Sequence, residues 1–277
     1  MVTVLGHRGA IVASGQPYQN TLAAFKLALT YGDGFETDAC LTADGHVVLA
    51  HSEKYTPKSV VYALTEHLDP ASAAQLGTRH LDDLTLAEVR HLRLANGATI
   101  PTLPEALAMV AAAPGKIINL ELKSYGVEAA VVPLLHDAFT NTALKPTQVI
   151  VSSFNHAALL AVRAAFPDLA LGLLCVQPDE AGMPLFPWRA DSTAAYQALT
   201  PALLDSAPVQ HIAPQYVILP NTALPLDVEL LAKHGLYAMI WVYTERADYN
   251  PQAFRAALNP LGDRLAGVIV DDVEAFG

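Results

Sequence analysis

Residues Gly34–Ser52 read GFETDACLTADGHVVLAHS, and this stretch predicts both a strand and a group of reactive side chains at its end. Glu36 and Asp38 stand two positions apart in an apolar run, so their carboxylates project from the same face of a strand. Asp44-Gly45 is a strong hairpin signal, because glycine tolerates the positive φ of a tight turn. Reflection of the chain about this dipeptide predicts that His51 lies opposite Asp38. We therefore expect a metal or acid–base site here.

Short apolar strands alternate with helical patterns along the rest of the chain, which is typical of a parallel sheet covered by helices. The expected strands are Val2–Gly6, Phe35–Leu41, Lys116–Leu122, Val149–Ser153, Ala170–Leu174, one within Gln210–Val217, Tyr237–Val242 and Gly267–Val270. The expected helices are Thr21–Tyr31, Leu86–Leu94, Leu103–Ala113, Val127–Asn141, Asn155–Phe166, Leu226–His234 and Pro251–Leu258.

Eight strands alternating with helices favour a closed α/β barrel, the (β/α)8 TIM barrel, over an open doubly wound sheet. The barrel carries a β-hairpin extension after its second strand and an insertion around residues 53–100. No internal repeat or linker divides the chain, so we expect residues 1–277 to form one domain.

The composition and the net charge argue against several classes of function. The chain is 52% apolar and 16% charged, and its net charge of −11 argues against binding nucleic acid through the phosphates. No apolar run reaches the roughly 18–20 residues of a membrane helix, so stable membrane insertion is not expected. Residues 1–6 lack the features of a signal peptide, which favours a cytoplasmic protein. Cys40 and Cys175 lie in apolar runs and are expected to be buried free thiols.

Reactive residues follow several of the expected strands, and the carboxyl ends of the strands are where TIM barrels carry out their chemistry. His7-Arg8-Gly9 follows the first strand, Lys123 follows the third, and Trp241 is the second-last residue of the seventh. Three carboxylates on adjacent strands suit one hard divalent cation, Mg²⁺ or Ca²⁺, whereas zinc would require more histidine or cysteine ligands. These three are Glu36, Asp38 and Glu121. They can also form an ion-pair cluster with the nearby cations, but their mutual repulsion favours a metal.

These motifs occur in a fixed order along the chain. They are His7-Arg8-Gly9, Asn20-Thr21-Leu22, Glu36-x-Asp38, Asp44-Gly45 followed by His51, Glu121-x-Lys123, Ser152-Ser153-Phe154 and Gly267–Asp271. Together they resemble the glycerophosphodiester phosphodiesterase family from the first strand to the last, most densely in residues 5–51 and 117–154. Gln19 and Ser52 depart from the pattern, because the family usually has a glutamate and an aspartate at these positions.

The resemblance implies a metal-dependent barrel that cleaves a small glycerophosphodiester to glycerol 3-phosphate and an alcohol. It implies a site in which Glu36, Asp38 and Glu121 bind the metal, His7 and His51 act as the acid–base pair, and Arg8 and Lys123 hold phosphate. Trp241 is a further substrate-binding candidate, either as a wall against glycerol or as barrel packing. Asp271 and Asp272 are expected to cap the last turn rather than to act.

Several alternatives stay open from the sequence. The Pro-rich loop Val176–Ala207 contains Met183–Trp188 and is expected to be a lid or a contact in a homo-oligomer. An apolar loop at the mouth also fits an enzyme for lysophospholipids or sugar-phosphate diesters. A non-catalytic phosphate-binding barrel and a Schiff-base aldolase using Lys123 remain, since the same barrel hosts many chemistries.

Overall fold

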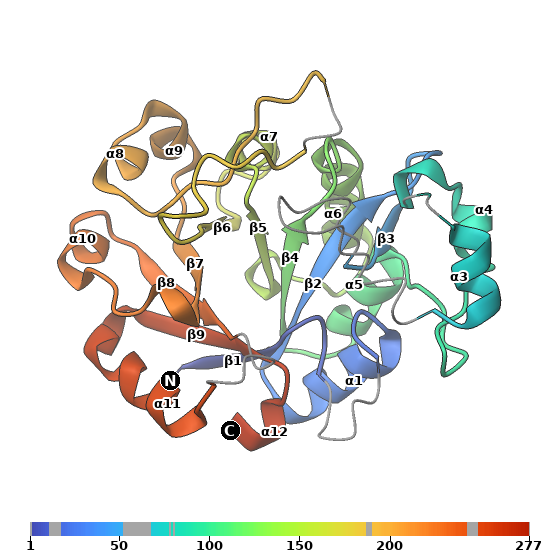
Figure 1. The fold of residues 1–277 in the computed structure, drawn as a ribbon, viewed down its shortest axis with the longest axis horizontal. Helices are drawn as coiled ribbons and strands as arrows, with labels where there is room; N and C mark the ends of the chain where they lie inside the picture. The colour runs from blue at the N-terminus through green and yellow to red at the C-terminus, as the bar shows by residue number, and fades with distance from the viewer. Residues whose placement is uncertain are drawn as a thin grey trace.

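The computed structural model describes residues 2–10, 18–51, 68–77, 79, 81–186, 190–242 and 249–276. Eight parallel strands form a sheet that closes into a barrel, because β1 pairs with both β9 and β2 (Figure 1). An antiparallel strand, β3, extends β2 outside the barrel. The strands are β1 Thr3–Gly6, β2 Gly34–Leu41, β3 Val47–Leu49, β4 Ile117–Leu122, β5 Val149–Ser153, β6 Ala170–Leu174, β7 Tyr216–Pro220, β8 Tyr237–Trp241 and β9 Leu265–Val270. The expected (β/α)8 barrel is confirmed.

Helices follow most of the strands and cover the outside of the barrel (Figure 1). They are α1 Leu22–Tyr31, α3 Pro70–Leu76, α4 Leu86–Val89, α5 Leu103–Ala111, α6 Glu128–Asn141, α7 His156–Ala165, α8 Pro201–Leu204, α9 Ala207–Ile212, α10 Val228–Lys233, α11 Pro251–Leu258 and α12 Val273–Phe276. Short 3-10 turns span Leu81–Asp83, Pro146–Gln148, Asn221–Ala223 and Asn259–Arg264. In the described part of the chain, no helix has both the length and the apolarity needed to cross a membrane.

Successive side chains of β2 point alternately to the outside and to the inside of the barrel. Phe35 points outward and stacks on Phe25 of α1 with ring centroids 4.2 Å apart, so this face joins the barrel to its helices. Glu36 and Asp38 point the other way, into the barrel. A separate apolar cluster closes the barrel interior and consists of Leu5, Ile150, Leu174, Ile218, Met239 and Ile269. The polar groups at the strand ends therefore lie over an apolar floor.

The expected hairpin forms, but its register differs by one residue from the prediction. Asp38 lies opposite Ala50, whose N–H donates to the Asp38 carbonyl at 3.1 Å. The turn holds three residues rather than two, since the N–H of Thr42 donates to the carbonyl of His46 at 2.8 Å. The register predicted by reflecting the chain about Asp44-Gly45 was therefore wrong by one residue. His51 follows directly after the paired residues instead of facing Asp38.

Two further predictions are wrong in detail. The sixth barrel strand is not within Gln210–Val217, because this region begins inside α9 and β7 starts only at Tyr216. Ser206 at the N-cap and Pro208 in the first turn signal that helix and were overlooked. In the insertion, Leu86–Leu94 shortens to α4, and α3 was missed although its N-cap Asp69 accepts from the Ser72 N–H at 2.7 Å.

Both cysteines are buried thiols that are not joined in a disulfide, as expected. Burial raises the pKa of the Cys175 thiol to about 12, which keeps it protonated and inert. In the loop Val176–Ala207, residues 187–189 lie outside the described residues, and so does Ser52. Phe186 of this loop is buried and packs edge-on against Tyr125, with ring centroids 5.4 Å apart.

Candidate active site

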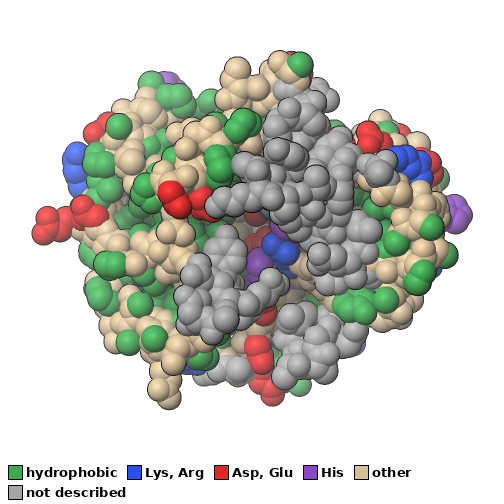
Figure 2. All heavy atoms as spheres, in the orientation of Figure 1, with side chains coloured by type: hydrophobic (Ala, Val, Ile, Leu, Met, Phe, Trp, Pro, Cys, Tyr) green, Lys and Arg blue, Asp and Glu red, His purple; other side chains and the backbone are tan. Residues whose placement is uncertain are grey.

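A pocket of about 470 Å³ opens at the carboxyl ends of the barrel strands. In Figure 2, histidine and basic side chains are visible at the bottom of a hollow near the centre of the molecular face. All eight residues singled out as metal ligands, acid–base groups or substrate contacts line this pocket. They are His7, Arg8, Glu36, Asp38, His51, Glu121, Lys123 and Trp241. The structure thus brings together residues from both halves of the chain.

Three carboxylates form the centre of the pocket. Glu36 and Asp38 come from β2 and Glu121 from β4, where it pairs in register with Asp38. Each offers one oxygen, and these oxygens all lie within 4.8 Å of one another. All three side chains are buried, so their charges are poorly screened by solvent. Three converging carboxylate oxygens are a donor set that suits a hard divalent cation.

Burial and mutual repulsion give the carboxylates different acidities. The pKa of Glu36 lies well above 4.5, because burial disfavours its charged form and the charges of Asp38 and Glu121 add to the effect. Burial also acts to raise the pKa of Asp38, but the nearby charges of His51 and Lys123 outweigh it and hold that pKa well below its usual range. Of Glu36 and Asp38, Glu36 therefore keeps a proton more readily, and a bound cation would replace that proton.

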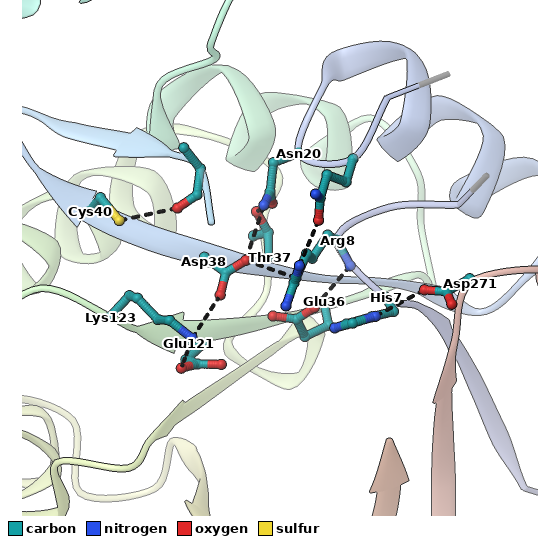
Figure 3. Close-up of polar contacts among 12 residues, drawn as sticks. His7, Arg8, Asn20, Glu36, Thr37, Asp38, Cys40, Glu121, Lys123 and Asp271 are labelled. Carbon is teal, nitrogen blue, oxygen red and sulfur yellow. Dashed lines mark hydrogen bonds and ion pairs between the residues drawn. The ribbon is translucent and has the colours of Figure 1, made fainter. Parts of the chain in front are cut away.

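Arg8 is fixed on both its backbone and its side chain (Figure 3). Its N–H donates to Oε2 of Glu36 at 2.9 Å, and Nη1 of its guanidinium donates to Oε1 of Gln19 at 2.7 Å. Its Nε lies 3.5 Å from Oδ2 of Asp38. The turn needs Arg8 at φ 55° and Gly9 at φ 91°, where a Cβ on Gly9 would approach α1 to 2.5 Å. Arg8 is thus held beside the carboxylates with Gln19 as a neutral partner.

His7 is oriented by a residue from the other end of the chain. Its Nδ1 lies 2.9 Å from Oδ1 of Asp271, which follows β9 (Figure 3). A carboxylate only accepts, so Nδ1 carries the proton and Nε2 is left to exchange a proton in the pocket. The expectation that Asp271 only caps the last turn missed this contact. The Trp241 ring also lies near His7, with the two ring centroids 6.5 Å apart.

Asn20 is a site residue whose contact the sequence analysis did not predict. It directly precedes the N-cap of α1, Thr21, whose hydroxyl accepts from the Ala24 N–H at 3.2 Å. Asn20 is buried at φ 52°, donates from Nδ2 to Oδ2 of Asp38 at 3.0 Å and accepts from the Thr37 hydroxyl at 2.6 Å (Figure 3). Its unusual backbone conformation aims the amide at the carboxylate.

Lys123 pairs with two of the carboxylates. Its Nζ lies 3.1 Å from Oε1 of Glu121 and 3.6 Å from Oδ1 of Asp38 (Figure 3). These pairs stabilise the charged ammonium, whereas a Schiff-base lysine must lose its proton to attack a carbonyl. The geometry therefore favours Lys123 as a cation that binds an anionic ligand over the aldolase alternative.

The pocket also has apolar and acidic lining residues besides the central charged groups. Phe154 and Tyr196 meet edge-on with ring centroids 5.1 Å apart, and Met183 of the proline-rich loop lines the same pocket. Asp179 and Glu180 of that loop line it as well. Residues of the loop Val176–Ala207 therefore line the pocket, and its expected role as a lid or as a contact in a homo-oligomer stays a prediction.

Comparison with known proteins agrees with this geometry. A family model described as the glycerophosphoryl diester phosphodiesterase family matches residues 7–275. The chain belongs to this family. The predicted resemblance is confirmed, and the match runs from the histidine after β1 to the last helix.

Individual relatives carry the same family name. A glycerophosphodiester phosphodiesterase of Caldanaerobacter subterraneus subsp. tengcongensis is 31% identical over 184 residues, which are 62% of this chain and 65% of that protein, somewhat less than two thirds of its length. The crystal structure of a glycerophosphodiester phosphodiesterase from Agrobacterium tumefaciens superposes with a TM-score of 0.65 at 18% identity, covering 100% of this chain and 99% of that one. A phosphodiesterase from Oleispira antarctica, solved with the product sn-glycerol-3-phosphate, gives a TM-score of 0.65 at 22% identity over 99% of this chain and 94% of that one. At these identities the structures support the fold.

Proposed function

We propose that this chain is a metal-dependent phosphodiesterase that cleaves glycerophosphodiesters to glycerol 3-phosphate and an alcohol. One observation carries the proposal, namely that three carboxylates, two cationic side chains and two histidines line one pocket. A phosphodiester needs charge neutralisation and proton transfer in the same place, and this pocket offers both. Family membership and the names of the relatives support the same reaction.

The three carboxylates would hold one divalent cation, Mg²⁺ or Ca²⁺. When bound, such a cation supplies charge neutralisation at a phosphoryl oxygen. Arg8 and Lys123 lie beside the carboxylates and would hold the remaining phosphate oxygens. The cationic side chains thus place the anionic group of the substrate against the metal ligands, while Trp241 forms a wall for the glycerol half.

Two histidines would carry the protons. His7, with Nδ1 held by Asp271, presents Nε2 to the pocket, and His51 lines the pocket from the end of the hairpin. One takes a proton from the attacking hydroxyl and the other gives one to the leaving alkoxide, and each such transfer contributes about 10²–10⁴ in rate.

The attacking group comes from the substrate. No side chain beside the two histidines in the described pocket is a convincing nucleophile, since Lys123 is held charged by its carboxylate partners. A glycerol hydroxyl next to the phosphate would attack and form a cyclic phosphate that water then opens. An oriented hydroxyl of this kind reaches effective molarities of about 10⁵–10⁸ M.

A second substrate class is favoured by the apolar lining of the pocket. Phe154, Met183 and Tyr196 offer apolar surface in the pocket, which suits the chain of a lysophospholipid better than a purely polar alcohol. The proposed enzyme is a single barrel domain over residues 1–277. Its cytoplasmic location, and a contact between copies through Val176–Ala207, stay predictions.

The deciding experiment is a phosphate-release screen. Glycerophosphodiesters and lysophospholipids are incubated with the protein, a coupled phosphatase and Mg²⁺, Ca²⁺ or Mn²⁺. We expect metal-dependent release that His51→Ala abolishes and His46→Ala preserves, because His46 lies on the same hairpin but is exposed. Absence of turnover across all substrates at saturating metal would revive the non-catalytic phosphate-binding barrel.

A further inference from the structure

One buried polar side chain in the pocket has no role in the site described so far. Asn119 lies in β4, in register with Glu36 of β2 and two residues before Glu121. Residues two apart on a strand share a face, so the Asn119 side chain points into the barrel with that of Glu121. It is 1% exposed and lines the pocket.

The amide oxygen of Asn119 is unsatisfied. Within the part of the chain that the structure describes, its Oδ1 is buried and has no hydrogen-bond partner. Buried polar atoms are paired in the great majority of native proteins, because an unpaired one loses its hydration without compensation. A ligand from outside the chain would therefore satisfy this oxygen.

Ser152 is a second buried side chain with an unpaired polar atom, and it differs from Asn119 in its access to the pocket. It lies on the neighbouring strand in register with Glu121, and its Oγ is also buried without a partner among the described residues. Ser152 does not line the pocket, whereas Asn119 does. Only Asn119 of this pair combines an unsatisfied oxygen with access to the cavity.

The side chains next to Asn119 determine which kind of ligand suits its Oδ1. Its neighbours in register and along the strand are Glu36 and Glu121, whose carboxylate oxygens are acceptors once a cation has displaced the proton of Glu36. An additional acceptor gains nothing from these carboxylates, whereas a cation is attracted both by them and by the amide oxygen. Calcium and magnesium take amide oxygens together with carboxylates, and a neutral amide adds a ligand without adding repulsion.

We propose that Asn119 Oδ1 is a fourth protein oxygen of the cation site, an inference that rests on the metal of the proposed function. The three carboxylates supply the charge, and Asn119 supplies a neutral oxygen from the inner part of the pocket. The cation would then be held by β2 and by two successive inward positions of β4.

The test measures cation binding without substrate. Isothermal titration with Ca²⁺ and with Mg²⁺, and the shift in melting temperature that each produces, are recorded for the intact chain and three variants. Asn119→Leu keeps the size but removes the oxygen, and we expect its dissociation constant to rise at least about tenfold. Asn119→Asp keeps the oxygen and is expected to bind at least as tightly as the parent. Ser152→Ala, the matched buried control, is expected to leave binding unchanged.

Several outcomes would overturn the inference. Parent-like binding by Asn119→Leu is one, and equal weakening by Ser152→Ala, which would indicate barrel packing, is another. Loss of binding in Asn119→Asp would show that the amide acts as a donor to the carboxylates. If Asn119→Leu fails to fold, Asn119→Ala takes its place. A parent that binds no cation overturns the inference, whereas a parent that binds cations but turns over no diester sinks only the proposed reaction.

Discussion

Nδ1 of His7 lies 2.9 Å from Oδ1 of Asp271, so the residue that follows the first barrel strand is oriented by one that follows the last. Both side chains are about one-fifth exposed, which leaves the pair partly shielded from solvent. The contact fixes the imidazole tautomer with its proton on Nδ1. Asp271 is thereby a positioning residue for the proposed proton transfer.

Replacing Asp271 tests this assignment. Asp271→Asn keeps the shape but no longer stabilises a protonated imidazole, so we expect kcat to fall by about 10²-fold with little change in KM. The pH profile of kcat should shift, which a purely structural role would not produce. Asp272→Asn is the neighbouring control and should retain activity. A normal kcat and pH profile in Asp271→Asn would contradict the assignment.

Metal removal gives a second prediction. Excess chelator should abolish turnover, and added Mg²⁺ or Ca²⁺ should restore it, because the three carboxylates repel one another without a cation. Glu36→Ala and Asp38→Ala should each weaken cation binding in a titration. Full activity in excess chelator would rule out the metal.

The Gln19 departure from the family pattern gives a third prediction. Gln19 accepts from the Arg8 guanidinium without neutralising it, whereas a glutamate would. Gln19→Glu should therefore weaken inhibition by inorganic phosphate and raise KM for a diester by about threefold to tenfold, at an interaction cost of about 1 kcal/mol. Gln19→Met removes the hydrogen-bond acceptor without adding a charge. Comparing it with Gln19→Glu therefore separates the effect of losing the acceptor from the effect of neutralising Arg8. Tighter phosphate inhibition in Gln19→Glu would contradict the argument.

The substrate itself can report the nucleophile. A diester with a hydroxyl next to the phosphate should be cleaved, while the matching deoxy or O-methyl diester should bind as a competitive inhibitor with almost no turnover. His51→Ala should lower kcat far more than it raises KM, because its role is proton transfer. Comparable cleavage of the deoxy diester would indicate direct attack by water.

His156 gives a prediction for the pH dependence of stability. Burial lowers its pKa below 6.5, and the hydrogen bond from Nε2 to the Leu174 carbonyl at 2.9 Å only partly offsets this. The unfolded chain therefore binds the proton more readily, so stability is lost as pH falls through 6.5 toward the lowered pKa of the folded state. His156→Gln should flatten the melting temperature between about pH 7 and 5.

A second histidine serves as the control. His211 also bonds a backbone carbonyl, that of Ala207, at 2.7 Å, but it is exposed. His211→Gln should leave the pH dependence of melting close to that of the parent. An unchanged slope in His156→Gln would show that burial of this histidine does not govern acid stability.

The barrel and the site positions were predictable because their signals are local. Strand–helix alternation gave the architecture, and the i, i+2 spacing of Glu36 and Asp38 placed both carboxylates in the barrel. The partners of these residues were harder to predict. Asp271 meets His7 only after the barrel closes, and the Asn20 contact depends on a backbone at φ 52° that local propensity does not anticipate.

The local errors also have physical causes. The hairpin prediction assumed a two-residue turn, and the third turn residue moved His51 out of register with Asp38. The sixth strand was misplaced because apolar residues in a short helix and in a buried strand look alike over so few positions, and Pro208 was not used to separate them.

Closure of the barrel joins β1 to β2 along a short seam that runs from Leu5 and Gly34 to Gly6 and Phe35. The proposed catalytic groups lie on both sides of that seam, with His7 and Arg8 on one and the carboxylates of β2 on the other. A refolding chain with β2 to β8 already assembled would possess the metal ligands and His51 but not an oriented His7, because His7 and Asp271 arrive with the first and last strands. The time at which turnover recovers during refolding therefore reports when the first and last strands of the barrel come together.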